Sequence, residues 1–510
     1  MSATPDLGRL ERIIDASGVS ERIEALLPVG VRPRQLTVRT LLIGMLLTLS
    51  DKRPAHLARV HEALIGLPGA DRRRLGVIAS WKTGPHELTY RQTERTFALV
   101  VRALSKEHPD GRPSETLSAI MDRLSEASVG VLGLPDNNSL AIDWTGYESF
   151  ARPPRKDGAC ADPEAAWGHR KTNHPGRSET FFGYHLQAAT IVKEENGPEV
   201  GELVRRITLS SCKHDPPAQI VPVIERMTRQ GIEIADLLGD SGYAYRAPET
   251  FAMPARALGA NLVIDLHPND RGCKGTHQGA IACNGNLYCP ATPQALFELG
   301  PLAPGATEQQ TAAHDKRTAE LARYKLSPLS APDPDGYHRA ICPAAAGKIR
   351  CPLRPSSMSL SHERPTITDP PEHPPACCEQ QTITVPPTVN TKTTQKHDWP
   401  SQAHRLSYAR RTAAERSFSQ VCDPASNDIS RGWSRLMGLT PNALMLTCAF
   451  IVANIRTADA FTARQAENQR RAERGLPPRK RARRRRSLHD LIAQANAPPA
   501  KANTPPAIAA

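Results

Sequence analysis

The sequence predicts a mixed α/β protein in which helices flank a sheet, with a helical segment before the sheet and a proline-rich segment after its strands. Three observations carry this prediction. Apolar residues recur at helical spacing through residues 1–135. Short apolar runs typical of strands follow in residues 136–266, with one helical pattern among them. Three strands, a helix and then further strands is the order typical of a mixed sheet.

Residues 1–135 are expected to form a helical N-terminal domain. Residues 36–49 and 55–67 have helical apolar spacing, and Ser114 can cap a further helix at its N-terminus. Arginines of this region could contact DNA phosphates, or they could be solvated charges on a helical bundle. DNA binding by this domain is therefore a hypothesis that the pattern alone does not decide.

Residues 136–266 are expected to form the first part of the sheet domain. The predicted strands, with one helix at 217–230, cover residues 139–144, 180–192, 202–210, 232–238 and 261–266. Asp143 lies near the end of the first strand, and Asp240 follows the fourth, before a glycine-containing turn. An aspartate at a strand end is more often a turn former than a ligand. Burying one without a partner is nevertheless costly, which makes both positions candidates.

The later chain divides into three predicted segments. Residues 267–400 lose periodicity, and positions 301–400 contain 16 prolines, which predicts an irregular insertion. Residues 401–460 are expected to be the helical C-terminal part of the sheet domain. Residues 461–510 contain 12 Lys or Arg and 3 Asp or Glu, which predicts a basic disordered tail.

Cysteines of the insertion are candidate ligands for Zn²⁺. A tetrahedral zinc site would stabilise a segment with little core. None of the spacings has the tight two-residue separation of a strong zinc motif, so unliganded thiols are the favoured interpretation. The residues concerned are Cys283, Cys289, Cys342, Cys351, Cys377 and Cys378, with His277 and His373 nearby.

The overall charge indicates a polyanionic partner. The net charge is +13 and the pI is near 9.3, although the tail carries most of that excess. The N-terminus has no secretory pattern, and the longest apolar runs, residues 41–49 and 443–453, are shorter than the 20 or so residues that span a bilayer. Eleven cysteines without a signal do not indicate a disulfide framework. A cytoplasmic protein without a membrane span is expected.

The segment of residues 408–418 holds the third candidate acid. A helix would place Tyr408, Arg411 and Glu415 on one face, since positions three and four apart are neighbours. Alone, an acid among arginines is typical of a surface salt bridge. Together with Asp143 and Asp240, Glu415 would supply the hard oxygen ligands that Mg²⁺ prefers.

These motifs, in this order, resemble those of the DDE transposases of bacterial insertion sequences, of the type with a Y-(2)-R-(3)-E-(6)-K signature. Residues 141–145 resemble the strand of the first aspartate, and residues 239–243 resemble the motif of the second. Tyr408, Arg411 and Glu415 match the first three signature positions, and Cys422 stands where the family has lysine. The resemblance covers roughly residues 136–266 and 401–456.

The resemblance implies an RNase H-like catalytic domain. It implies that Asp143, Asp240 and Glu415 bind Mg²⁺ or Mn²⁺, and that the enzyme cleaves transposon ends and joins a 3′-hydroxyl to target DNA. Tyr408 and Arg411 would contact double-stranded DNA, on which the protein would act as a homodimer with paired ends. Arginines near the signature could replace the missing lysine; the candidates are Arg416, Arg431 and Arg435.

Trp433 is a candidate for stacking on a DNA base, because an aromatic face accepts any base. Packing in the core is the alternative for this residue.

Two other functions also stay open for the chain. It could be a catalytically degenerate protein that only binds DNA, which the cysteine at position 422 favours, or a nuclease of the same fold that does not join DNA. In each case a bacterial, nucleoid-associated location is expected.

Overall fold

The structure is a computed structural model, and it divides into a unit of residues 1–458 and a unit of residues 459–510. Each unit is described by itself. The basic run of the predicted tail lies, from residue 480 onward, outside the described residues. The described residues are 6–29, 34–81, 84–105, 110–154, 160–171, 178–303 and 305–479.

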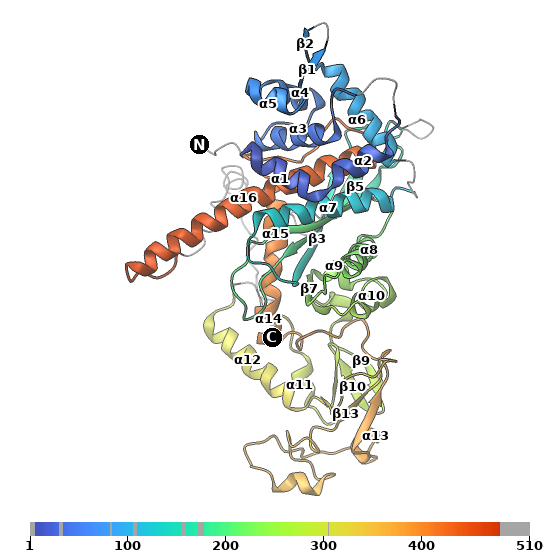
Figure 1. The fold of residues 1–510 in the computed structure, drawn as a ribbon. Coiled ribbons are helices and arrows are strands. Elements are labelled where there is room, and N and C mark those ends of the chain that lie inside the picture. The colour runs from blue at the N-terminus through green and yellow to red at the C-terminus, as the bar shows by residue number, and fades with distance from the viewer. Residues whose placement is uncertain are drawn as a thin grey trace, which may run out of the picture. The chain divides into compact units, whose positions relative to one another are not determined.

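A mixed six-stranded sheet carries the candidate site (Figure 1). The central order is β5–β3–β7–β8, in which β3, β7 and β8 are parallel and β5 is antiparallel to β3. The other edge of β5 pairs first with β4 and then with β6. This sheet confirms the predicted mixed α/β class, although β4 was not predicted. The strands are β3 (Leu140–Glu148), β4 (Ala166–Lys171), β5 (Ser178–Ile191), β6 (Val204–Ser211), β7 (Asp236–Gly239) and β8 (Asn261–Ile264).

Helices cover both faces of this sheet because its strands alternate apolar residues between the two sides. Leu140 and Ile142 of β3 pack in one hydrophobic cluster with the helices that follow β6 and β7. Ala141 lies on the other face and packs against the helix α15 (Thr412–Val421). The helices of the first face are α8 (Pro216–Arg229), α9 (Ser241–Ala244) and α10 (Ala252–Ala257), with a 3₁₀ turn η1 (Pro248–Thr250).

The N-terminal segment is helical, as predicted. Ser114 caps α7, since its hydroxyl accepts a hydrogen bond from the Leu117 amide at 3.1 Å. A short hairpin, β1–β2, was not predicted. The elements are α1 (Leu7–Ser17), α2 (Val19–Leu26), α3 (Val38–Ser50), α4 (Leu57–Ile65), α5 (Gly69–Arg74), β1 (Ile78–Trp81), β2 (Gly84–Glu87), α6 (Tyr90–Leu104) and α7 (Glu115–Leu132).

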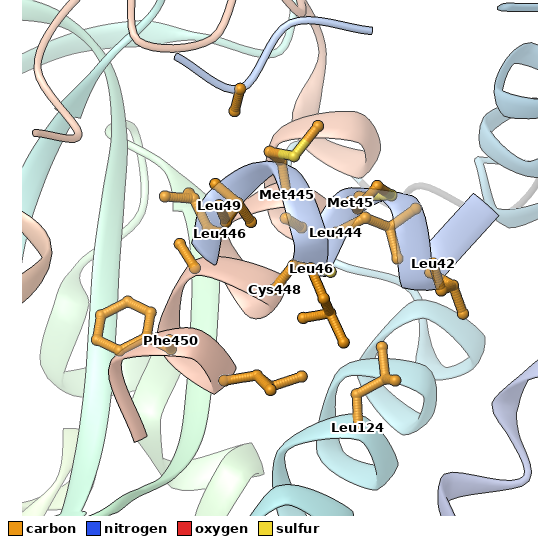
Figure 2. Close-up of a cluster of buried hydrophobic side chains, with 14 of the residues drawn as sticks. Leu42, Met45, Leu46, Leu49, Leu124, Leu444, Met445, Leu446, Cys448 and Phe450 are labelled. Carbon is orange, nitrogen blue, oxygen red and sulfur yellow. The ribbon is translucent and has the colours of Figure 1, made fainter. Parts of the chain in front are cut away.

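These N-terminal helices share one hydrophobic core with β5, β6 and the late helix α16 (Leu439–Glu473). Figure 2 shows Leu46 of α3 and Leu124 of α7 beside Leu444 and Cys448 of α16. Residues separated by hundreds of positions in the sequence therefore pack together in the same hydrophobic core. The N-terminal helices pack directly on the first part of α16.

The predicted irregular insertion is an organised region, and that expectation is corrected. It holds two three-stranded antiparallel sheets and a 16-residue helix, α12. Two of its prolines occupy positions that regular structure tolerates: Pro328 lies in the edge strand β12, and Pro375 precedes α13. The elements are η2 (Pro268–Asp270), β9 (Cys273–His277), β10 (Ala280–Cys283), β11 (Asn286–Tyr288), α11 (Gln294–Phe297), α12 (Glu308–Arg323), β12 (Ser327–Pro328), β13 (His338–Ile341), η3 (Pro355–Ser359), α13 (Ala376–Glu379) and β14 (Thr382–Val385).

The C-terminal segment is helical and extends further than predicted. Helix α14 (Gln402–Tyr408) leads through a 3₁₀ turn, η4 (Ala409–Arg411), into α15. The disordered tail expected from residue 461 is corrected in part, because α16 continues to Glu473. By length and composition, α16 is the one helix in the described part of the chain that could cross a membrane. However, 78% of its apolar window is buried in protein, as in the core helix of a soluble protein.

Candidate active site

The two candidate aspartates lie on one face of the sheet, Asp143 within β3 and Asp240 directly after the adjacent parallel strand β7. The register pairs Leu140 with Leu237 and Ala141 with Leu238, and two residues further along come Asp143 and Asp240. Because side chains alternate across a strand, both acids lie on the face that carries Ala141 and α15. The carboxyl ends of neighbouring parallel strands meet at one edge, so the fold brings these two acids together.

Local hydrogen bonds orient each aspartate. The Asp143 carboxylate accepts from the Trp144 amide at 2.9 Å. Asp240 caps the short helix α9 and accepts from the Gly242 amide at 2.9 Å. A side chain at position 242 would collide with the Trp144 ring, since a Cβ there would lie 2.3 Å from it. Glycine is therefore what lets Trp144 pack over the turn that holds Asp240.

Glu415 approaches the same face on α15. This helix lies close to the sheet because its contact residues are small: Ala413 and Ala414 are buried against Ala141 and Leu238. The Thr190 hydroxyl of β5 also donates to the Ser417 hydroxyl at 3.1 Å. Sequence analysis predicted one continuous helix here, whereas the structure has a 3₁₀ turn just before α15.

The pKa of Asp143 depends on both other acids, so the three acids form one electrostatic group. Burial raises its pKa first, and the negative charge of Asp240 raises it next. Glu415 adds to the rise, while Arg411 and the Trp144 amide oppose it. The result is a pKa of about 6 for Asp143. Perturbed carboxylates of this kind are concentrated at functional sites.

Arg411 is the cation of this group. Its Nη2 donates to the Glu415 carboxylate, and its Nη1 lies 3.8 Å from an Asp143 oxygen. Its guanidinium carbon lies 5.4 Å from the centre of the Tyr408 ring, in cation–π contact. The Nε of Arg411 is buried and donates to no acceptor among the described residues.

A buried ion network, which the sequence analysis missed, fixes the segment before Glu415. Asp236, four residues before Asp240, accepts from Arg410 at 2.8 Å and from Lys396 at 2.8 and 2.9 Å. Both Asp236 and Arg410 are buried. This network joins β7 to the turn that leads into α15. Its only signal in the sequence was an acid at the start of an apolar strand.

Glu195 extends this network from the segment after β5. It accepts hydrogen bonds from Ser407 and His397 at 2.7 Å, and it pairs with Lys396 at 3.2 Å. Burial alone would raise the pKa of Glu195, but these three partners outweigh it and lower the pKa to about 2. The turn before α15 is thus held both by Asp236 of β7 and by Glu195, which follows β5.

The remaining predicted DNA contacts lie in different environments. Tyr408 stacks on His404, with ring centres 5.7 Å apart. Arg416 pairs with Glu202, and the guanidinium carbon of Arg435 lies 5.9 Å from the Phe150 ring centre. Trp433 is only 4% exposed and packs in the large core, which favours the packing interpretation over base stacking.

In the part of the chain that the structure describes, no set of metal ligands is found at the family's lysine position or among the cysteines of the insertion. Cys422 directly follows α15 and is exposed. All eleven cysteines are free thiols. Cys289, Cys342, Cys351 and Cys378 are buried and near enough to influence one another's charge. Among the described residues, no group of three or more His, Cys, Asp or Glu side chains is arranged to hold a metal ion.

The three acids still fit a hard divalent cation by the chemistry of their donor set. All are carboxylates, and the pKa of Asp143 is raised first by burial and then by repulsion from the other two acids, a repulsion that a divalent cation would relieve. The arrangement is not that of a finished metal site, because Arg411 bridges two of the acids. Comparison with known proteins adds nothing to this picture, because no family model and no curated protein matches the chain.

Proposed function

We propose that this chain is a DNA transposase of the DDE type, which cleaves the ends of an insertion sequence and joins the 3′-hydroxyl to target DNA. The observation that carries the proposal is the meeting of Asp143, Asp240 and Glu415. One acid lies within β3, the second directly follows the adjacent parallel strand β7, and the third comes from a late helix on the same face. This is the arrangement that the resemblance to DDE transposases leads us to expect.

The order of the sheet supports an RNase H-like fold. The strands run β6–β5–β3–β7–β8, and only β5 is antiparallel to the rest. Asp143 thus lies on the central strand, Asp240 follows its neighbour, and Glu415 lies on a helix that packs against the sheet. All three placements agree with those that the resemblance implies.

The proposed mechanism assigns the acids the role of ligands. When bound, two divalent ions would activate the attacking oxygen and stabilise the leaving one. Asp143 must lose its proton to act as a ligand, which its pKa of about 6 allows near neutral pH. No separate general base from the protein is needed. Tyr408, Arg411, Arg416 and Arg435 would contact the DNA, and the buried Trp433 is dropped from this set.

The proposed partner is double-stranded DNA in the bacterial cytoplasm. Transposases of this kind typically act as homodimers on paired ends, and we extend that assembly to this chain. The basic residues of the tail would add phosphate contacts that carry no sequence information and weaken with salt. No membrane partner is proposed.

A degenerate DNA-binding protein is the second candidate, and one observation favours it. Cys422 replaces the lysine of the signature, and it follows α15 without a basic side chain at that position. In that case the acids would survive only as a structural group balanced by Arg411.

The experiment that separates the candidates begins with the DNA beside the coding region. Inverted repeats on both sides would supply matched end duplexes for a cleavage assay with Mg²⁺ or Mn²⁺, compared against EDTA. The transposase proposal predicts metal-dependent cleavage followed by joined products in target DNA. Binding without cleavage would support the degenerate protein, and cleavage without joining would support a nuclease.

A further inference from the structure

We propose that Arg411 and the divalent ions occupy the acidic site in turn. Arg411 is the counter-ion of the DNA-free protein, and it leaves the acids for a DNA phosphate when metal binds. This inference rests on the proposed function, since it concerns the regulation of the same site. It makes metal binding and DNA binding mutually dependent.

The contacts of Arg411 place it where a bound cation would have to sit. Its two terminal nitrogens face Glu415 and Asp143, which come from α15 and β3. The Arg411 side chain is only 14% exposed, whereas that of Glu415 is 52% exposed. The guanidinium is thus more deeply buried than the carboxylate with which it pairs.

Electrostatics argue that the two cations cannot share the site. A divalent ion held by Asp143 and Glu415 would meet the guanidinium at the distance of an ion pair. Repulsion between a single and a double positive charge at that range is strong in a partly buried site. The three acids carry at most three negative charges, fewer than two divalent ions bring, so no charge is left over for Arg411. Metal binding therefore requires the arginine to turn away.

Arg411 has a destination that suits a phosphate. Its Nε is buried and unsatisfied among the described residues, so it has donor capacity that no protein acceptor uses. The planar guanidinium fork matches the paired oxygens of a phosphate better than a lysine would. A DNA phosphate beside the site would thus pull Arg411 off the acids and open them to metal.

The test measures Mn²⁺ binding to the full-length, DNA-free protein by the electron paramagnetic resonance signal of free Mn²⁺. Arg411→Gln removes the competing cation, so Mn²⁺ affinity is expected to rise on the order of tenfold. Arg170→Gln is the matched control. It removes the same charge from strand β4, where the guanidinium pairs with Glu148 and Glu179. Its affinity is expected to stay within about twofold of wild type, since an exposed charge is screened.

Unchanged or weaker Mn²⁺ binding in a folded Arg411→Gln protein would overturn the inference. A second measurement uses the wild-type protein and does not depend on that variant folding. Mn²⁺ affinity is expected to rise when an end duplex is added, because coupling between two ligands is reciprocal; no rise would also overturn the inference. The double variant Asp143→Asn, Asp240→Asn subtracts binding elsewhere. Equal Mn²⁺ binding by that double variant and wild type would instead refute the proposed metal site.

Discussion

Asp143 is the residue at which function and stability oppose each other. Its carboxylate lies in a partly buried position beside two other acids, and its pKa is raised to about 6. A raised acid pKa means that the folded protein holds the proton more tightly than the unfolded chain. Stability is therefore greatest below the unfolded pKa of about 4, and it falls as the pH rises toward 6. Above pH 6 the folded protein bears the full free-energy cost of a charged Asp143.

Asp143→Asn is accordingly expected to stabilise the metal-free protein above pH 6. The gain should be about 1–3 kcal/mol near pH 8, because an amide carries no charge that burial would penalise or that would repel Asp240. Thermal unfolding of both proteins at pH 4 and pH 8, with EDTA present, measures the effect. A gain that is equally large at pH 4, where the wild-type acid is protonated, would contradict this explanation.

The Asp236–Arg410 pair is predicted to be a large contributor to the placement of the turn before α15. Asp236→Asn leaves Arg410 and Lys396 facing a neutral partner, so the free energy of unfolding should fall by about 3–5 kcal/mol. Arg416→Ala serves as the comparison, since its salt bridge to Glu202 is more exposed and should contribute about 1 kcal/mol or less. Urea denaturation measures the free energy of unfolding of both variants. Similar losses of that free energy would argue against a special role for Asp236.

At the residue scale, sequence reasoning reached the acids but not what surrounds them. Asp143, Asp240 and Glu415 stood in motifs with fixed local spacing, so they could be chosen without a structure. Asp236 and Glu195 could not, because their partners lie far away in the sequence. The burial of Trp433 could not be predicted either, since a single tryptophan in a sequence is compatible with a core position and with a DNA-binding surface.

At the scale of elements, helix α15 places Glu415 through the small size of its buried residues. Ala413 and Ala414 let the helix lie close to β3 and β7. Ala414→Leu should push the helix away, lower the free energy of unfolding by about 1–3 kcal/mol and weaken Mn²⁺ binding. Ala403→Leu, at an exposed position on α14, should change neither quantity appreciably. Normal metal affinity in a folded Ala414→Leu protein would show that the spacing of α15 is unimportant.

The elements that sequence predicted well are those with a strong local period. The strands β3, β5, β6 and β8 and the helices α3, α7 and α8 all appear near their predicted positions. The insertion was missed because its strands are only two to five residues long, too short for periodicity to show. Pro328 lies in an edge strand and Pro375 precedes a helix, which composition alone does not reveal.

At the scale of the whole molecule, residues 1–458 depend on contacts between distant parts of the chain. The N-terminal helices bury their apolar faces against α16, which begins at Leu439 (Figure 2). A fragment of residues 1–135 is therefore expected to lack a cooperative unfolding transition, because its core would be open to water. Circular dichroism during thermal denaturation measures this. A sharp, reversible transition in the fragment would show that the helical segment is an independent domain.

The central claim is that Asp143, Asp240 and Glu415 act together in metal-dependent DNA cleavage. The most direct measurement is the rate of end-duplex cleavage in Mg²⁺ by wild type and by Asp143→Ala, Asp240→Ala and Glu415→Ala, each checked for folding and for DNA binding. All three variants are expected to bind the duplex almost as wild type does and to cleave it at no measurable rate. Wild-type cleavage by any one of the three would contradict it.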